Sequence, residues 1–220
     1  EPVEDVARYL SNWFDGIVAR AKVHSHMERL GGAARIPVIN ARTNFNHPCE
    51  ILGDLAYIRS KRGSIEGLKV AFVGEATNLC HPWLEAAARL PIEAIQVCPQ
   101  GYQTDPDFIS ALQREAVGSL GVTHDLEAGL KGADVIYTDT WTSMGQEEET
   151  KKRQAVFPPY QVNAALVAEA KENVILMHCL PAHRGEEITD KVADGTHSRL
   201  FPQAHNRLHA QKAILVKLVQ

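Results

Sequence analysis

The chain has 220 residues, of which 45% are hydrophobic and 23% are charged, a composition that is ordinary for a globular protein and allows one large domain or two small ones. The formal net charge is only −4, and no block of like charges stands out, so we expect no nucleic-acid partner. Because no run of about 18 apolar residues occurs and the acidic start lacks a signal-peptide pattern, we expect no membrane association and a cytoplasmic location.

The first part of the chain is predicted to contain short elements. Two helices and two strands are expected, namely a helix over residues 3–14, a strand over 17–19 ending at Arg20, a helix over 24–34 and a strand over 36–40. A longer helix is predicted from His47 to about residue 59. Pro48 falls in its first turn, where the missing N–H costs little.

From residue 64 the pattern changes to strands that alternate with helices. Strands are predicted over residues 68–73, 94–98, 122–124, 134–138 and 174–178, and helices over residues 78–90, 105–118, 160–172 and 202–219. Asp105 is the expected N-cap of the second of these helices, with Pro106 at its first position. This alternation predicts an α/β fold with a doubly wound parallel sheet.

Polar side chains follow the ends of the predicted strands. They are Arg20, the residues at 46–48, the turn at 74–78, the segment 139–145 and the segment 179–181. In parallel sheets, ligands bind beyond the carboxyl ends of the strands. We therefore expect a ligand site that these segments build together.

Several of these segments also allow simpler interpretations. The turn at 74–78 lacks the GxGxxG pattern of dinucleotide sites, and Asn78 could simply cap a helix there. The spacings of His178-Cys179, His183 and Cys80-His81 do not pair as metal ligands usually do, so no metal is expected. The four cysteines form no CxxC pair, and we expect free thiols. Cys179 could be a buried core residue, but its polar neighbours favour a functional loop.

The most loop-like segment lies at residues 145–159. It combines acidic residues at 147–149 with basic residues at 151–153 and ends in Pro158-Pro159. It is either a solvated charged loop or helix, or a mobile lid over the ligand site.

Four segments together resemble the aspartate/ornithine carbamoyltransferase superfamily, in the family's order. Residues 178–181, His-Cys-Leu-Pro, are similar to the signature of the ornithine branch, and residues 139–147 resemble its ornithine-binding loop. Residues 46–52 resemble its His-Pro-x-Gln segment, and residues 205–207 resemble the Glu-Asn-Arg before its final helix. The resemblance covers essentially the whole chain.

The resemblance implies transfer of a carbamoyl group from carbamoyl phosphate to the δ-amine of L-ornithine, giving L-citrulline and phosphate in arginine biosynthesis. It implies a partial carbamoyl phosphate-binding domain at residues 1–60, a Rossmann-like ornithine-binding domain at 61–199 and a C-terminal helix at 200–220 that returns to the first domain. It also implies a homotrimer and no cofactor.

The resemblance also assigns roles to ten residues. The carbamoyl phosphate ligands are expected to be Arg20, His47, Glu50, Cys179, Leu180 and Arg207, of which Arg20, His47, Cys179 and Arg207 are the expected catalytic residues. The ornithine ligands are expected to be Asn78, Asp139, Ser143 and Met144.

The chemistry suits these residue types. An arginine donates two hydrogen bonds at once to a phosphate, and Arg20 with His47 can donate to the carbonyl oxygen as charge develops on it. The attacking amine must be uncharged, and Asp139 could pair with the α-ammonium group of the acceptor. Phosphate is a competent leaving group, so no covalent enzyme intermediate is required. Much of the acceleration should come from holding the two substrates in line.

Three departures from the family pattern shape the expectation. The family's Ser-Thr-Arg-Thr phosphate loop is absent from these residues, Glu50 stands where the family has Gln, and the turn at 74–78 differs from Gly-Asp-Gly-Asn-Asn. We therefore expect the 220 residues alone to be inactive or weakly active. A sister carbamoyltransferase that uses putrescine or an acylated ornithine, and a non-catalytic amino-acid-binding homologue, are the alternatives.

Overall fold

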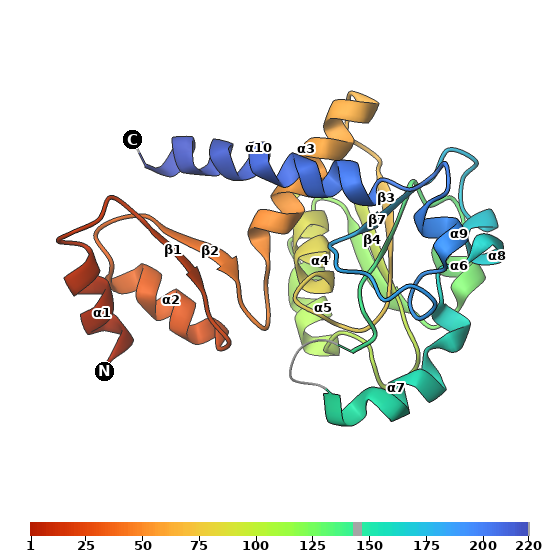
Figure 1. Cartoon of the computed structure of the whole chain (residues 1–220), viewed down its shortest axis with the longest axis horizontal. Coiled ribbons are helices and arrows are strands. Elements are labelled where there is room, and N and C mark those ends of the chain that lie inside the picture. Colours follow the sequence, from red (N-terminus) through yellow and green to blue (C-terminus); the bar gives the residue numbers. More distant parts are fainter. Residues whose placement is uncertain (143–146, 220) are drawn as a thin grey trace.

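The structure is a computed structural model that describes residues 1–142 and 147–219. Its first 47 residues form a small unit, here called the N-terminal lobe (Figure 1). Strands β1 (Ile17–Arg20) and β2 (Val38–Arg42) pair in parallel. Helices α1 (Val3–Leu10) and α2 (His24–Ala33) lie against each other beside them.

Residues 66–199 form the sheet lobe around a five-stranded parallel sheet. The strand order is β5-β4-β3-β6-β7. The strands are β3 (Lys69–Val73), β4 (Glu93–Val97), β5 (Ser119–Thr123), β6 (Val135–Thr138) and β7 (Ile175–His178). The chain adds strands in one direction from β3 to β5 and then continues on the other side with β6, so the order reverses between β3 and β6. Ligands bind at such a reversal in open α/β sheets.

Both faces of this sheet are covered by helices, which confirms the doubly wound prediction. Helices α4 (Cys80–Arg89) and α5 (Pro106–Gln113) cover one face, and α6 (Leu126–Leu130), α8 (Ala164–Ala168) and α9 (Asp190–Ala193) cover the other. Alternate residues of β3 belong to different cores: Val70 and Phe72 face α4, and Ala71 and Val73 face α6. A strand that is buried on both faces has the uninterrupted apolar sequence seen here.

Two long helices connect the lobes. Helix α3 (Pro48–Arg62) lies between them. Helix α10 (Leu200–Leu218) contacts β7, packs along α3 and reaches the N-terminal lobe (Figure 1). The contact includes buried polar bonds: Gln203 Nε2 donates to Asp54 Oδ1 at 2.9 Å, and Asn206 Nδ2 donates to the Gly53 carbonyl at 2.7 Å. None of the described helices is both long and apolar enough to cross a membrane.

Some predicted boundaries were wrong. The strand predicted at 36–40 is β2 at Val38–Arg42, and the strand predicted at 122–124 begins at Ser119. The helix predicted over 160–172 is reduced to α8, because Val162 pairs with Ile188 in a β-bridge and the Asn163 side chain caps the helix by accepting from the Leu166 N–H. The helix predicted over 3–14 ends at Leu10 and that over 105–118 ends at Gln113.

Other sequence predictions were confirmed. Asp105 caps α5 by accepting from the N–H groups of Asp107 and Phe108, and Pro48 occupies the first turn of α3. The described cysteines are all free.

The charged segment that follows residue 146 contains a 3₁₀ turn (Glu147–Glu149), helix α7 (Thr150–Val156) and a second 3₁₀ turn (Pro158–Tyr160).

Candidate active site

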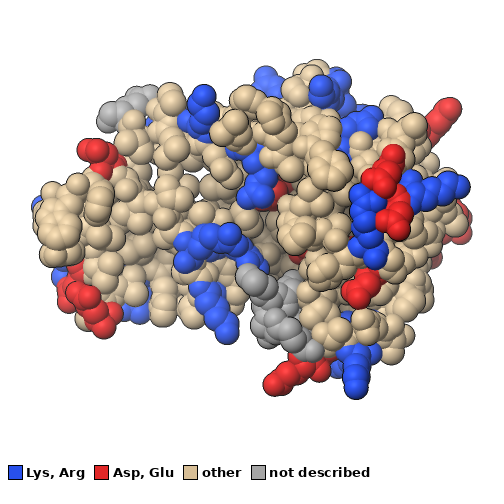
Figure 2. Space-filling model, in the orientation of Figure 1, with Lys and Arg blue, Asp and Glu red and all other residues tan. Residues whose placement is uncertain are grey.

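A pocket of about 340 Å³ lies between the lobes, beyond the carboxyl ends of β1, β2, β3, β6 and β7. Figure 2 shows lysine and arginine side chains around the hollow between the two lobes. The pocket brings together every predicted site residue that the structure describes, namely Arg20, His47, Glu50, Asn78, Asp139, Cys179, Leu180 and Arg207. Ser143 and Met144 lie outside the described residues.

One wall of the pocket is basic. Arg20 ends β1, Arg42 ends β2, and Arg207 comes from the second turn of α10. Arg207 Nη2 lies 3.1 Å from Glu50 Oε2, and its buried Nε has no hydrogen-bond partner among the described residues. Arg42 was not predicted as a site residue, although it ends a strand as Arg20 does. This wall can bind a small anion, because arginines supply several donors in a fixed plane.

His47 lies behind this basic wall, at the N-terminus of α3. Burial, together with the positive charges of Arg207, Arg20 and Arg42, lowers the pKa of its imidazole to about 4. The ring is therefore neutral at pH 7. A neutral imidazole can still donate one N–H to an oxygen on which negative charge develops, as an oxyanion site requires.

Glu50 lies in the first turn of α3, with 1% of its surface exposed. Burial raises the pKa of its carboxyl to about 7, against the opposing effect of Arg207 and with a further increase from Asp139. Its Oε2 faces Arg207 and lies 3.6 Å from His47 Nε2, while its Oε1 has no partner among the described residues.

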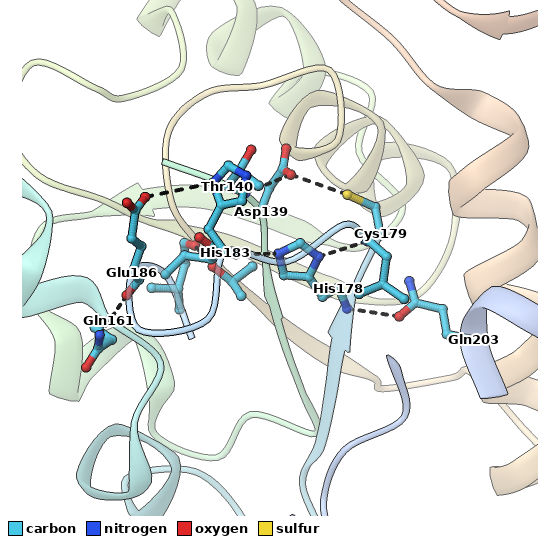
Figure 3. A network of polar contacts seen from close by, with 12 residues as sticks. Asp139, Thr140, Gln161, His178, Cys179, His183, Glu186 and Gln203 are labelled. Atoms are coloured by element: carbon cyan, nitrogen blue, oxygen red, sulfur yellow. Dashed lines mark hydrogen bonds and ion pairs between the residues drawn. The ribbon is translucent and has the colours of Figure 1, made fainter. Parts of the chain in front are cut away.

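Asp139 and Cys179 face each other at the ends of β6 and β7. The thiol of Cys179 donates to Asp139 Oδ1 at 3.3 Å, and the same oxygen accepts from the Thr140 N–H at 2.8 Å (Figure 3). Burial raises the pKa of both groups, and the nearby Asp139 charge raises the pKa of Cys179 further. Cys179 is thus a neutral thiol that positions the carboxylate, and this opposite wall can pair with a cationic group.

A buried chain of hydrogen bonds supports the loop after β7 (Figure 3). The Leu180 N–H donates to His178 Nδ1 at 2.8 Å, so the ring proton lies on Nε2, which lies 3.1 Å from Glu187 Oε1. The His178 N–H donates to Gln203 Oε1 at 2.9 Å, and the His183 N–H donates to Glu187 Oε1 at 2.6 Å. Leu180 has φ of +56°, an uncommon conformation for leucine that these bonds hold in place.

The turn at 74–78 does not follow the simpler interpretation, in which Asn78 caps a helix. Asn78 does not cap α4: the Thr77 hydroxyl accepts from the N–H groups of Leu79 and Cys80, at 3.2 and 3.4 Å. The Asn78 amide instead donates to the Thr43 carbonyl at 2.6 Å. Asn78 therefore joins the two lobes and also lines the pocket.

Helix α7 is tied to the rim of the pocket through Arg153, which is 2% exposed. Its guanidinium donates to Glu75 in the 74–78 turn, to the Trp141 carbonyl at 2.9 Å and to Glu149 at 2.9 Å. The segment is thus not simply a solvated charged loop. Its proposed role as a lid remains a prediction.

Three side chains at the rim could chelate a cation. Ligand atoms of His183, Glu186 and Glu187 lie within 4.8 Å of one another. Glu187 is already used by His178 and by the His183 N–H. We therefore assign this group a structural role.

Known proteins resemble this chain over its whole length. Residues 1–60 match the family model described as the carbamoyl-P binding domain of aspartate/ornithine carbamoyltransferase, and residues 66–218 match that of its Asp/Orn binding domain. The chain is 48% identical to the ornithine carbamoyltransferase of Carboxydothermus hydrogenoformans over 222 residues, covering 100% of the chain and 71% of that protein. It is 46% identical to that of Chlorobaculum tepidum, covering 100% of the chain and 65% of that protein.

Solved structures agree. The ornithine carbamoyltransferase from Pyrococcus furiosus superposes with a TM-score of 0.93 at 44% identity, covering 100% of this chain and 71% of that chain. An N-acetyl-L-ornithine transcarbamylase superposes with a TM-score of 0.83 at 27% identity, covering 99% of this chain and 72% of that chain. The protein has the two-part α/β carbamoyltransferase architecture. It belongs to the aspartate/ornithine carbamoyltransferase family.

Proposed function

We propose that the protein transfers the carbamoyl group of carbamoyl phosphate to the δ-amine of L-ornithine, giving L-citrulline and phosphate in arginine biosynthesis. The observation that carries the proposal is the two-sided pocket. Three arginines and a neutral His47 line one wall, and the Asp139–Cys179 pair lines the other.

The basic wall is the donor side. Arg207 and Arg20 bind the phosphate group, and the Arg207 Nε, which has no partner among the described residues, supplies a hydrogen bond to it. His47 donates to the carbonyl oxygen of the carbamoyl group, where negative charge develops on attack. Leu180 offers its backbone carbonyl, and Cys179 lies close to the same group.

The opposite wall is the acceptor side. Asp139 pairs with the α-ammonium group of ornithine. Asn78 Nδ2, which donates one N–H to the Thr43 carbonyl, donates its other N–H to the ornithine carboxylate. On the family resemblance alone, Ser143 and Met144 are proposed as further ornithine ligands. The δ-amine attacks as the free base, because only the neutral amine has a lone pair.

The reaction needs no covalent intermediate on the protein. The C–O bond to phosphate breaks as the amine nitrogen bonds to the carbonyl carbon, and the departing phosphate takes the proton that the nitrogen loses. Holding both substrates in line supplies much of the acceleration. We assign no cofactor or metal to the reaction. We further propose that the domains divide at residues 1–60, 61–199 and 200–220, with the last helix completing the donor domain.

An assay for citrulline tests the proposal. The protein is incubated with carbamoyl phosphate and, in parallel, with L-ornithine, putrescine or N-acetyl-L-ornithine. Citrulline from ornithine, with at least tenfold less product from the other amines, is the expected result. Since turnover of these residues alone is expected to be slow, titration calorimetry with L-ornithine gives a second readout. Faster turnover of putrescine or acetylornithine would assign the protein to a sister activity.

Asp139→Asn tests the acceptor side directly. Removing one charge from the pair with the α-ammonium should weaken ornithine binding by roughly tenfold or more. Carbamoyl phosphate binding should change much less. Equal losses for both ligands would contradict the two-sided assignment.

The protein's assembly and location are proposals that rest on the family. We propose a homotrimer in the cytoplasm. Light scattering at micromolar concentration checks the assembly, with a mass of three chains as the expected result and a monomer as the contradicting one.

A further inference from the structure

Glu50 is an acidic residue inside an anion-binding wall. Its side chain is 1% exposed and lines the pocket. Oε2 lies 3.1 Å from Arg207 Nη2 and 3.6 Å from His47 Nε2. Oε1 is buried and has no partner among the described residues, so a buried acceptor is left for a ligand.

The surroundings of Glu50 contain more acidic than basic groups at close range. Arg207 is the only cation in ion-pair contact with it in the described part of the chain. Three other acidic groups act on it or respond to it electrostatically: Asp54 on the next turn of α3, Asp139 at the end of β6 and the thiol of Cys179. His178 lowers the pKa of Glu50 electrostatically, whereas His47 and Tyr137 face it as neutral groups. Arg20 and Arg42 face His47 from β1 and β2.

A phosphorylated donor would compete with Glu50 for Arg207. The ionised carboxylate already occupies Nη2, and a second anion on the same guanidinium would lie next to it inside the protein. Two like charges at a shared buried site favour protonation of one of them. The neutral carboxylic acid removes this repulsion and keeps an oxygen that can accept from the carbamoyl amide.

Building on the proposed function, we propose that Glu50 is protonated when the phosphorylated donor is bound. Binding of the dianion takes up one proton from the solvent, and departure of the phosphate product returns it. Glu50 is thus a specificity residue that couples donor affinity to pH, whereas a glutamine at this position could not do so.

The free protein is poised for this uptake. Burial and Asp139 raise the pKa of the Glu50 carboxyl to about 7. A bound dianion raises it further, so the donor binds the protonated form more tightly. Affinity is then independent of Glu50 below pH 7 and decreases by about tenfold per pH unit above it, until the pKa of the bound state is reached. His47, with a pKa of about 4, stays neutral throughout this range.

Sulfate is the probe for a first test, because it is a tetrahedral dianion whose charge is constant between pH 6 and 9. Titration calorimetry in two buffers of different ionisation enthalpy, at pH 8, gives the number of protons taken up per sulfate. The expected value is close to one for the unaltered protein. No proton uptake, or no sulfate binding at any pH, would overturn the proposal, and this measurement needs no variant.

Glu50→Gln provides the second test. Its sulfate affinity should be nearly independent of pH between 7 and 9, with no proton uptake, while the unaltered protein loses about tenfold per pH unit. Glu85→Gln is the matched control. Glu85 is a part-buried carboxyl with a raised pKa that bonds to Asn46 and does not line the pocket. It should keep the pH dependence of the unaltered protein.

The same profiles separate this proposal from the proposed function. Proton-coupled sulfate binding without any citrulline would leave the Glu50 proposal intact and contradict the carbamoyl transfer. Citrulline production with the same pH dependence of sulfate affinity in the unaltered protein and in Glu50→Gln would contradict the Glu50 proposal alone.

Discussion

At the scale of single residues, Asp139 controls the reactivity of Cys179. After burial itself, the Asp139 charge is the largest cause of the raised pKa of this thiol, and the thiol donates its hydrogen to Asp139. The thiolate, which is the form that reacts with alkylating reagents, is therefore rare at neutral pH.

Asp139→Asn should make this thiol more reactive. The substitution removes the negative charge, so the pKa of Cys179 falls, and each unit of decrease raises the thiolate fraction about tenfold. We expect iodoacetamide to label Cys179 roughly tenfold faster at pH 8, measured by mass spectrometry of its peptide.

Cys179→Ser identifies the signal in that experiment. The other cysteines are buried, and burial raises the pKa of Cys98 to about 12 and that of Cys49 above its ordinary value, so they should label slowly in both proteins. An unchanged or slower rate at Cys179 in Asp139→Asn would show that the carboxylate does not hold the thiol neutral.

Glu187 stabilises the loop after β7 through His178. Both side chains are fully buried, and the carboxylate accepts from the imidazole and from the His183 N–H. Glu187→Ala leaves these two donors unpartnered. We expect it to lower the free energy of unfolding by roughly 3 kcal/mol, measured by urea denaturation.

Glu186→Ala is the neighbouring control. Glu186 is partly exposed, and its carboxylate lies 3.8 Å from the His183 ring, so the loss should be below about 1 kcal/mol. Equal losses at the two positions would mean that the bond to His178 contributes little.

Part of the pocket lining was predictable from the sequence because several of its residues follow strands. Arg20, Asp139 and Cys179 all occupy strand ends, and the carboxyl ends of parallel strands meet at one edge. Arg42 obeys the same rule and was missed, because the predicted strand stopped at residue 40 and so placed Arg42 in a loop. The pairing of Glu187 with His178 depends on tertiary contacts that no spacing in the sequence reveals.

At the scale of elements, strands were predicted better than short helices. Strand β3 is an apolar run buried on both faces, which sequence reveals directly. Helices α6 and α9 have only five and four residues. They are too short to show a helical period and were not predicted. Helix α7 carries a buried arginine among exposed charges, a pattern that reads as solvated until its partners are known.

Arg153 should contribute more to the stability of α7 than the exposed charged residues beside it in the same helix. It is buried and bonds to Glu75, Trp141 and Glu149, so it connects three segments of the sheet lobe. Arg153→Ala leaves the Glu75 carboxylate without this partner. We expect a loss of roughly 3 kcal/mol in the free energy of unfolding and faster amide exchange in residues 147–160.

Lys151→Ala is the control for the charge alone. Lys151 precedes Arg153 by two residues in the same helix and is exposed, so the free energy of unfolding should change by less than about 0.5 kcal/mol. If exchange in residues 147–160 stayed slow in Arg153→Ala, the helix would be held by its apolar contacts instead.

At the scale of the whole molecule, buried carboxyl groups lie where the lobes meet. Glu50 and Asp54 come from α3 and Asp139 from the sheet lobe, and burial raises the pKa of all three. A group whose pKa is raised by folding stabilises the native state below its unfolded pKa. That stabilisation is lost as the pH rises through the folded pKa.

Glu50→Gln should therefore stabilise the protein relative to the unaltered chain as the pH rises. The pKa of Glu50 shifts from 4.5 to about 7 on folding, so the difference in free energy of unfolding between variant and unaltered protein should grow by roughly 3 kcal/mol between pH 4.5 and 7.5. Carboxyls with a lowered pKa, such as Glu4 at about 2, lose their contribution to stability only at lower pH.

Urea denaturation at several pH values measures the difference in free energy of unfolding between Glu50→Gln and the unaltered protein. For Glu66→Gln, at an exposed position, this difference should not change with pH. A difference that stayed flat in Glu50→Gln would mean that the carboxylate is as well solvated in the folded protein as in the unfolded chain, and the pocket between the lobes would then be open to water on its Glu50 side.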